Sequence, residues 1–397
     1  MSAPADPGNP SLAARPYDLV IVGASFAGLV AARTAAMRGL DVAVLDAKPE
    51  AGHRVATTGI LVKEAAEEID IPHTLTRRVR GVRLYGPSRR AIDLFAPGYF
   101  FLTTDTANVL RWLASEAVRA GAKILYRARF AGADRDGGVF RFHGLNIAAR
   151  YILGADGARS SVARAFGLGR NTKFLTGLEV EYEGLAAADP RFLHCFLDSR
   201  LAPGYLGWVA PGPVVTQAGL AVGPGRTPDL KAFLAATEPI FKYSKARAVE
   251  KRSGRIPAGG LVRPWSTEGV MLVGDAAGHV SPATGGGIKL AFELGRRAAH
   301  CIADHLQLIG PRPEIALAPA LPNFALKKTM RTALDLAPPN ALIDMSLGFS
   351  PMRWLAQHVY FHRRGTGAMS FAEYEAKLRS EADDAAARTY RTASPGA

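Results

Sequence analysis

The sequence predicts a mixed α/β fold with a parallel βαβ unit near its start, an antiparallel sheet in its middle and helices at its end. Residues 17–46 contain a strand, a helix and a second strand within about thirty residues, the length of a βαβ unit. From residue 175 to 222, strand-like runs alternate with Gly and Pro, which is typical of antiparallel strands joined by turns. Residues 309–397 alternate amphipathic helical patterns with Pro breaks.

The composition is that of a folded protein of more than one module. The chain has 397 residues, of which 48% are hydrophobic and 21% are charged, so it is not globally disordered. Two cysteines, Cys195 and Cys301, cannot form a disulfide framework or a four-cysteine zinc site. We therefore expect no metal and a cytoplasmic location.

The sequence contains neither a typical signal peptide nor a typical membrane span. Residues 1–16 are rich in Pro, Ala and Ser and lack the apolar core of a signal peptide, so we expect a disordered lead-in. Residues 201–225 carry no charge, but four Pro and six Gly interrupt them. Because backbone groups at such breaks would be unpaired in hydrocarbon, the sequence favours loops and strands here.

The first strand, over residues 17–22, ends at a glycine turn that leads into a helix over residues 27–38. Gly23 allows the tight turn, and Gly28 allows the helix to pack closely on the sheet. The free amides at the start of this helix suit a pyrophosphate. Ser25 stands where a second glycine normally allows the backbone to approach that pyrophosphate.

The second strand, over residues 41–46, closes with an acid. Asp46 follows Gly23 at close to the spacing expected of a carboxylate that holds ribose hydroxyls. Together these features predict dinucleotide binding, although the glycines of a parallel unit could also serve only to shape a turn. The motif does not choose between FAD and NAD.

Further elements follow in order. Residues 83–87 and 91–95 flank a Pro-Ser-Arg-Arg turn and predict a hairpin. Residues 107–120 have helical apolar spacing that ends at Gly121, and residues 286–308 return to a helical pattern.

Two further segments identify the nucleotide. Residues 151–164, YILGADGARSSVAR, and residues 270–290, VMLVGDAAGHVSPATGGGIKL, resemble two signatures of the para-hydroxybenzoate hydroxylase-like flavoproteins. The resemblance implies a Rossmann-like FAD-binding domain, with Asp156 and Gly157 near the dinucleotide and Asp275 on the ribityl chain. It also implies that the backbone of residues 285–287 approaches the isoalloxazine. The expected cofactor-binding residues are Gly23, Ser25, Phe26, Ala27, Gly28, Asp46, Ala47, Arg54, Thr58, Gly59, Asp156, Gly157, Gly274, Asp275, Pro282, Gly285, Gly286, Gly287 and Ile288.

Within that superfamily the chain is similar to the geranylgeranyl reductases. GDAAGHVSPATGGGI looks like their second flavin motif, and residues 203–211, PGYLGWVAP, resemble their aromatic pocket segment, with Tyr205 and Trp208 at the matching places. The resemblance implies hydride transfer from reduced flavin N5 to an unactivated double bond of an isoprenoid lipid, completed by a proton. Tyr205 and Trp208 are the expected pocket residues, with two core aromatics as the alternative. The electron donor is expected to be NAD(P)H or a reduced carrier.

Three places depart from the family patterns. Ala210 and Gly212 flank Pro211, where the reductases commonly have Phe-Pro-Lys. Thr106 stands where these flavoproteins often have an arginine facing the pyrophosphate, a loss that Arg54 or Arg111 could make good. The pair Thr58-Gly59 replaces the family's Cys-Gly or Ser-Gly, and Thr58 could contact the flavin or substrate or cap a helix.

The domain division implied by these motifs is discontinuous. We expect the FAD-binding domain over residues 17–70, 100–168 and 256–308, the substrate domain over residues 71–99 and 169–255, and a helical C-terminal region over residues 309–397.

The alternative activity is an NAD(P)H-dependent FAD monooxygenase that hydroxylates an apolar or aromatic substrate. The fold would be the same, but the pocket segment and the helical tail favour the reductase. A halogenase is disfavoured because the Trp-x-Trp-x-Ile-Pro signature is absent, and a scaffold without turnover is disfavoured because the flavin signatures occur together. No residue is assigned as the proton donor; His279, in its glycine-rich loop, is expected to be a surface or phosphate-side histidine.

The formal charge of +14 is concentrated in three segments of the chain. Residues 71–92, 241–255 and 321–364 together hold +15, which predicts local anionic partners. Residues 350–364, SPMRWLAQHVYFHRR, are typical either of an interfacial helix or of a helix packed on the body. Peripheral contact with an anionic membrane is expected, and nucleic acid is not, because no helix-turn-helix or aromatic-interleaved pattern accompanies the basic residues.

Overall fold

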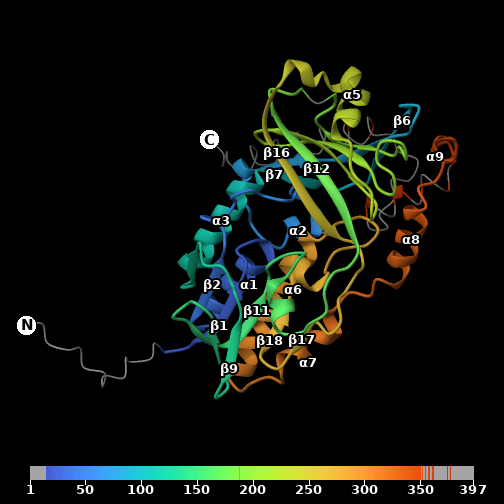
Figure 1. Cartoon of the computed structure of the whole chain (residues 1–397). Helices are drawn as coiled ribbons and strands as arrows, with labels where there is room; N and C mark the ends of the chain where they lie inside the picture. The colour runs from blue at the N-terminus through green and yellow to red at the C-terminus, as the bar shows by residue number, and fades with distance from the viewer. Residues whose placement is uncertain are drawn as a thin grey trace, which may run out of the picture.

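The structure is a computed structural model, and it describes residues 15–349 except residue 187, together with residues 351, 354, 356, 357, 360, 361, 373 and 376. The predicted lead-in over residues 1–16 and the predicted interfacial helix over residues 350–364 fall mostly outside these described residues. Figure 1 shows a parallel sheet with its helices, a second sheet above it and a helical edge.

The parallel sheet is built around β1 (Tyr17–Val22), which pairs with β2 (Val42–Asp46) on one side and β11 (Ala148–Gly154) on the other. The apolar side chains of β1 and β2 are almost fully buried, as expected for a parallel sheet covered by helices. The predicted βαβ unit is confirmed. The other strands of this sheet are β8 (Lys123–Tyr126), β9 (Ala133–Asp136), β10 (Val139–Phe142), β17 (Ser266–Thr267) and β18 (Val270–Leu272).

Three long helices pack together on this sheet. The helix α1 (Phe26–Met37) contacts both α3 (Thr106–Arg119) and α6 (Ile288–Leu306). Small side chains of α1 let this helix approach its neighbours closely. Most residues of α1 are buried. Each of these helices begins within two residues of its predicted start, and shorter helices are α2 (Lys63–Ala66) and α4 (Ser161–Ala165).

The second sheet has seven strands in the order β16-β12-β15-β14-β13-β5-β6. Neighbouring strands are antiparallel except for the parallel pair β5–β13, so the predicted antiparallel layer is confirmed with one exception. The hairpin predicted over residues 83–95 is the β5–β6 pair. The strands are β5 (Gly81–Tyr85), β6 (Ala91–Phe95), β12 (Phe174–Glu183), β13 (Phe192–Phe196), β14 (Gly207–Pro211), β15 (Thr216–Val222) and β16 (Arg247–Pro257).

The two faces of this sheet differ in what covers them. On one face, Leu220 and its neighbours pack on Phe233 of α5 (Leu230–Phe241). Because successive strand residues point to opposite faces, Ala221 lies on the other face. It forms a small apolar cluster there with Leu175, Ala258, Tyr205, Trp208 and Ile256.

A small three-stranded sheet contacts the segment between the two larger ones. Its order is β3-β7-β4, with β3 (Ile60–Val62), β7 (Phe101–Thr104) and β4 (Thr76–Val79). Short 3-10 turns occur at residues 73–75, 243–245, 274–277 and 318–320.

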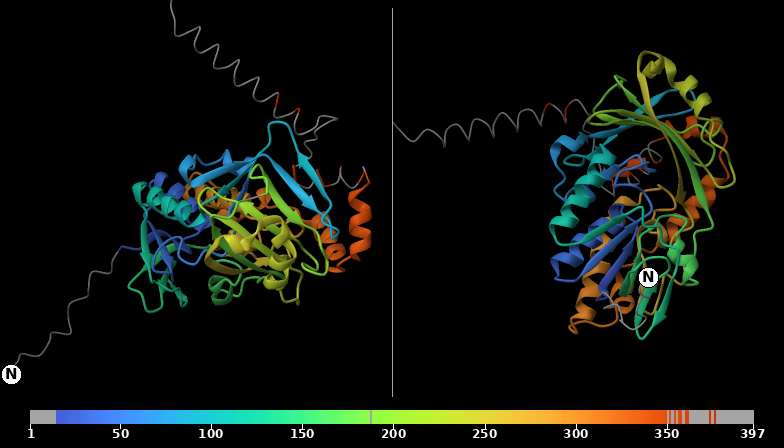
Figure 2. Two further views of the ribbon diagram at one scale, coloured as in Figure 1. Left: turned by 90° about the horizontal axis from the view of Figure 1, so that it is seen from above. Right: turned by 60° about the vertical axis from the view of Figure 1, so that its left-hand side comes forward.

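The C-terminal helices follow the edge of the molecule (Figures 1 and 2). They are α7 (Pro313–Leu317), α8 (Ala325–Asp335) and α9 (Asn340–Leu347). Arg331 of α8 is only 3% exposed and donates a hydrogen bond to the backbone carbonyl of Gly204. The amide side chain of Asn340 in α9 donates to Asp198 at 2.7 Å. In the part of the chain that the structure describes, no helix has the length and apolarity needed to span a bilayer.

Candidate functional site

The turn after β1 has no room for side chains at its two glycines. Gly23 has a φ of +111°, and a Cβ there would lie 2.3 Å from the carbonyl oxygen of Ala155. A Cβ on Gly28 would lie 1.9 Å from the carbonyl oxygen of Gly23. Ser25 is exposed and occupies the N-cap of α1, but its side chain caps no amide. The first amides of α1 therefore face outward without a side-chain partner, which is an arrangement suited to a phosphate group.

Asp46 ends β2 beside this turn. One oxygen of its carboxylate accepts a hydrogen bond from the backbone amide of Ala24 at 2.7 Å, and the other accepts from Lys48 at 2.8 Å. The carboxylate is thus fixed next to the glycine turn. The neighbouring Ala47 is exposed.

Two residues of the motif pack into the core. Phe26 meets Phe292 of α6 edge to face, with ring centroids 5.5 Å apart. A Cβ on Gly295 of α6 would lie 2.6 Å from the carbonyl oxygen of Ala27. Phe26 and Ala27 therefore hold α1 against α6.

Asp156 in the second motif caps a helix. Its carboxylate accepts hydrogen bonds from the Ser160 hydroxyl at 2.6 Å and from the Ser161 amide at 2.6 Å, at the start of α4. Gly157 follows with a φ of +81°. This pair shapes the turn between β11 and α4.

Asp275 in the third motif is half-buried, and its carboxyl group has no hydrogen-bond partner among the described residues. Burial raises the pKa of its carboxyl from 3.8 to about 6. Its Oδ1 would lie 3.5 Å from a Cβ on Gly287, the N-cap of α6. Gly274 packs on Ala27 of α1, so this motif and the first motif are adjacent.

The glycine loop of the third motif meets the second sheet. Gly285 has a φ of +65°, and a Cβ there would lie 2.7 Å from the hydroxyl oxygen of Tyr205. That hydroxyl donates a hydrogen bond to the backbone carbonyl of Thr284. Pro282 is buried, and α6 starts at Ile288 without a side-chain cap. The structure therefore places the pocket segment against the loop that carries the expected isoalloxazine contacts.

The loop around Thr58 meets the same sheet face from another side. Gly59, with a φ of +76°, packs on Thr106, whose buried hydroxyl lies within hydrogen-bonding distance of the Thr104 hydroxyl and the Thr58 carbonyl. Thr106 thus packs against this loop and stabilises its conformation. Arg111 bonds to Glu50 at 2.8 Å.

Arg54 is exposed, with a φ of +46°. Its backbone carbonyl accepts a hydrogen bond from Lys48.

Thr58 and Trp208 converge on a carboxyl group that the sequence did not single out. The Thr58 hydroxyl and the Trp208 indole N–H both donate to Oε2 of Glu179, at 2.6 Å and 2.8 Å. Glu179 is 5% exposed, and burial raises the pKa of its carboxyl above the usual range. Glu179, Glu181 and Glu183 alternate along β12, so the sequence signal was three acids on one strand face, two of them buried.

His279 is not at the surface as predicted. Its side chain is fully buried, and its Nδ1 accepts a hydrogen bond from the Gly274 amide at 3.2 Å. Burial lowers the pKa of the imidazole to about 3. His279 is therefore neutral at physiological pH and supports the third motif from inside.

These residues fit FAD. The glycine turn has room for a phosphate group, and Asp46 places a carboxylate beside it. Asp275 is half-buried and has no partner among the described residues, and a ribityl hydroxyl would supply one. Among the described residues no cluster of His, Cys, Asp and Glu is arranged as a metal site.

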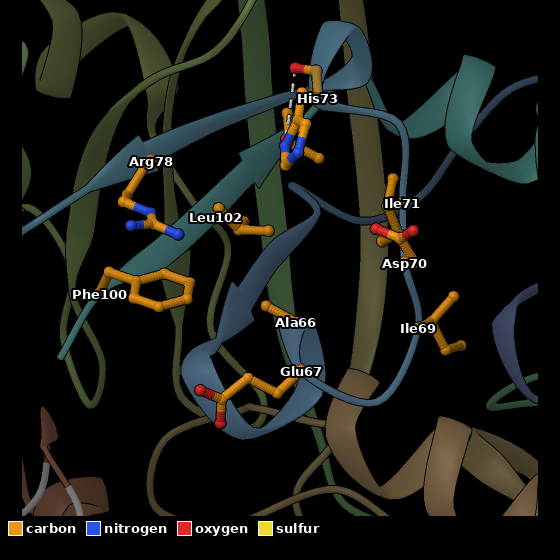
Figure 3. A pocket seen from close by; sticks show the side chains of 10 residues that line it. Ala66, Glu67, Ile69, Asp70, Ile71, His73, Arg78, Phe100 and Leu102 are labelled. Atoms are coloured by element: carbon orange, nitrogen blue, oxygen red, sulfur yellow. Dashed lines mark hydrogen bonds between the residues drawn. The ribbon is translucent and has the colours of Figure 1, made fainter. Parts of the chain in front are cut away.

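A separate pocket of about 600 Å³ is open beside α2, β4 and β7 (Figure 3). The Arg78 guanidinium lies 4.1 Å from the centre of the Phe100 ring on one wall, and Glu67 lies across from them. None of the residues that line it belongs to the flavin motifs. Two arginines of the neighbouring basic stretch are already paired: Arg83 with Asp93, and Arg89 with Asp198.

Comparisons with known proteins agree with this geometry. The family described as FAD binding domain matches residues 16–307. A digeranylgeranylglycerophospholipid reductase of Methanosarcina acetivorans is 29% identical over 71% of this chain and 74% of its own length. Another, of Methanothrix thermoacetophila, is 32% identical over 72% of this chain and 78% of its own. The crystal structure of a geranylgeranyl bacteriochlorophyll reductase-like protein of Thermoplasma acidophilum superposes with a TM-score of 0.75, at 23% identity, over 92% of this chain and 99% of that one.

Proposed function

The chain belongs to the FAD binding domain family, together with the digeranylgeranylglycerophospholipid reductases it resembles, and is an FAD-dependent oxidoreductase; from this premise we propose that it saturates carbon–carbon double bonds of an isoprenoid lipid. The observation that carries the proposal is the apolar cluster containing Tyr205 and Trp208, in which Tyr205 and Ile256 lie against the glycine loop of the third flavin motif. A digeranylgeranyl glycerophospholipid is the substrate class that the relatives' names suggest.

FAD, when bound, supplies a hydride equivalent at N5. The residues expected to hold it are the turn at Gly23 and Gly28 for the pyrophosphate, Asp46 for a ribose and Asp275 for the ribityl chain. The start of α6, after Gly287, has no side-chain cap, so its backbone amides would be available to stabilise negative charge on the flavin ring.

An isolated alkene has no carbonyl for the protein to polarise. The protein therefore accelerates its reduction by holding the double bond in place and by keeping water away. Leu175, Ala221 and Ile256 give the sheet face the apolar surface for this, and Tyr205 and Trp208 give it flat walls. Residues 71–99 and 169–255 would then act as the substrate domain.

The runner-up function, an FAD monooxygenase, uses the same cofactor site, so the substrate reaction must separate the two. The test is anaerobic: the reduced holoenzyme is mixed with a polyprenyl glycerophospholipid, and flavin reoxidation is followed by absorbance. Reoxidation without oxygen, with a saturated product by mass spectrometry, supports the reductase. Reoxidation that requires oxygen and yields a hydroxylated product would falsify it.

Titration of the oxidised holoenzyme with NADH, NADPH or a reduced ferredoxin identifies the electron donor.

Collection of a lipid substrate calls for membrane contact, which we place on the C-terminal helices. Leu326, Leu336, Leu342 and Met345 of this region are each more than half exposed, and Lys327 and Lys328 stand beside the first of them. Apolar side chains flanked by lysines suit the boundary of an anionic bilayer. Co-sedimentation with vesicles containing anionic lipid at low salt, weakened by Leu342→Ser with Met345→Ser, is expected. Absence of binding at low salt would remove the idea.

A further inference from the structure

The carboxyl group of Glu179 lies where the two halves of the site meet. Thr58 comes from the loop after β2, on the cofactor side, and Trp208 comes from β14 on the substrate side. Both donate to the same oxygen, Oε2. The apolar cluster that holds Tyr205 and Ile256 lies on this same sheet face.

A glycine in the neighbouring strand makes this arrangement possible. Gly219 of β15 pairs with Glu179 on one side and with Trp208 on the other. A Cβ on Gly219 would lie 2.9 Å from the Trp208 ring and 3.0 Å from the Glu179 Cβ. The missing side chain leaves the space through which the indole reaches across a strand to the carboxyl group. A glycine in the middle of a sheet weakens the strand, so its presence here marks this close approach.

The hydrogen bonds decide which oxygen can carry a proton. Oε2 already accepts from an O–H and an N–H. Oε1 has no hydrogen-bond partner among the described residues, so a proton on Glu179 belongs on Oε1. Burial favours the protonated form, and the charged groups that face it are Arg252 on β16 and Glu181 on its own strand. Arg252 is itself paired with Glu181 at 2.8 Å.

We propose that Glu179 is the acid that protonates the alkene carbon in the reaction, and that Thr58 and Trp208 position it. The inference rests on the proposed reductase function. Two C–H bonds form in the step: one carbon takes the hydride that reduced FAD supplies, and the π electron pair takes the proton from Oε1. The alkene is reduced by two electrons and the flavin is oxidised by two. The Glu179 carboxylate that remains is stabilised by the two donors on Oε2 and recovers its proton from water after the product leaves.

The substitution Glu179→Gln separates proton donation from scaffolding. The glutamine carbonyl still accepts from Thr58 and Trp208, but the side chain no longer carries an acidic proton. We expect the alkene-dependent reoxidation of reduced holoenzyme to fall by about 100-fold or more, the usual range for loss of a general acid. Glu183→Gln, a carboxyl further along the same strand face that pairs with Arg247 and not with Arg252, is the matched control and should keep the wild-type rate.

Further readouts test the role of Glu179 besides the size of the rate. The FAD spectrum and the rate of flavin reduction by the donor should be unchanged in Glu179→Gln. The infrared difference spectrum of wild type minus Glu179→Gln at neutral pH should contain the C=O band of a protonated carboxylic acid. The pH profile of the wild-type reoxidation rate should fall on its alkaline side as Glu179 ionises, and this limb should be missing in the variant.

The outcomes distinguish a failure of the proposed role of Glu179 from a failure of the proposed reductase function. If wild type reoxidises with the alkene and Glu179→Gln does so equally fast, Glu179 is a structural residue and the proposal is wrong, while the reductase function stands. An infrared difference that shows only carboxylate bands also overturns the proposal. If wild type itself fails to react with polyprenyl lipids, the reductase function fails and the role of Glu179 as its acid fails with it.

Discussion

The hydroxyl of Tyr205 donates a hydrogen bond to the backbone carbonyl of Thr284. This bond joins the seven-stranded sheet to the glycine loop of the third flavin motif, and the close approach leaves no room for a Cβ at Gly285. An apolar ring and a hydrogen bond on the same residue thus set the spacing between the pocket wall and the flavin loop.

Tyr205→Phe should keep the ring and lose the bond. We expect the free energy of unfolding to fall by about 1 kcal/mol, the net worth of one hydrogen bond, and the alkene-dependent rate to fall because the loop is no longer fixed. Denaturant unfolding and stopped-flow reoxidation check the two parts. Tyr182→Phe is the control, because Tyr182 is buried on the opposite sheet face and its hydroxyl makes no hydrogen bond to a described residue. Equal effects of the two substitutions would contradict the assignment.

Gly28→Ala should abolish tight FAD binding. The new Cβ would lie 1.9 Å from the carbonyl oxygen of Gly23, so the phosphate turn or the helix must move. Overpacking of this kind costs about 1–3 kcal/mol, or roughly 5- to 150-fold in affinity. Flavin fluorescence titration of the apoprotein measures it. The control is Gly259→Ala, where a Cβ would meet only Lys173, at 3.9 Å; similar affinities for the two variants would sink the prediction.

Asp275→Asn should stabilise the apoprotein at high pH and weaken the binding of FAD. The folded apoprotein holds the Asp275 proton more tightly than the unfolded chain does, because burial raises its pKa from 3.8 to about 6. Wild type therefore loses stability as the pH rises from about 4 to about 6, and the loss persists above that. The asparagine variant lacks this titration. Its Tm should match wild type near pH 4 and exceed it at pH 8, and parallel Tm curves would refute the account.

His194→Gln should reduce the sensitivity of the fold to acid. His194 is fully buried; its Nε2–H donates to the Asp189 carbonyl at 2.9 Å, and its Nδ1 accepts from the Tyr85 hydroxyl at 3.1 Å. Burial lowers the pKa of the imidazole from 6.5 to about 4. Its contribution is therefore complete above pH 6.5 and is lost as the pH falls towards 4. Chemical unfolding at pH 7 and pH 4.5 measures the slope, with the exposed His143→Gln as control; an unchanged slope in His194→Gln rejects it.

Local sequence signals were sufficient for the cofactor half of the molecule. The glycines at 23 and 28 have structural reasons that depend on backbone contacts within one βαβ unit, and such contacts are encoded by short-range spacing. The pocket segment could be placed by resemblance, but not its contact with Thr284, which joins residues 79 positions apart.

Glu179 could not have been found from its own neighbourhood. An acid in an alternating strand ordinarily faces water, and only the pairing of β12 with β15, and of β15 with β14, brings Gly219 and Trp208 to it. The prediction that His279 lies at the surface was wrong for a related reason. A glycine-rich loop looks exposed in the sequence, but in the fold the His279 side chain is fully buried, and burial keeps the imidazole neutral.

The bond from Arg331 to the carbonyl of Gly204 has an evolutionary consequence. The family match ends at residue 307, before α8 begins, yet α8 fixes the backbone next to Tyr205 through this one guanidinium group. Under the proposed function, selection on the tail can therefore change which substrate is accepted while the motifs that bind the cofactor stay unchanged. Relatives with the same redox chemistry and different lipid ranges should then differ most in their C-terminal helices.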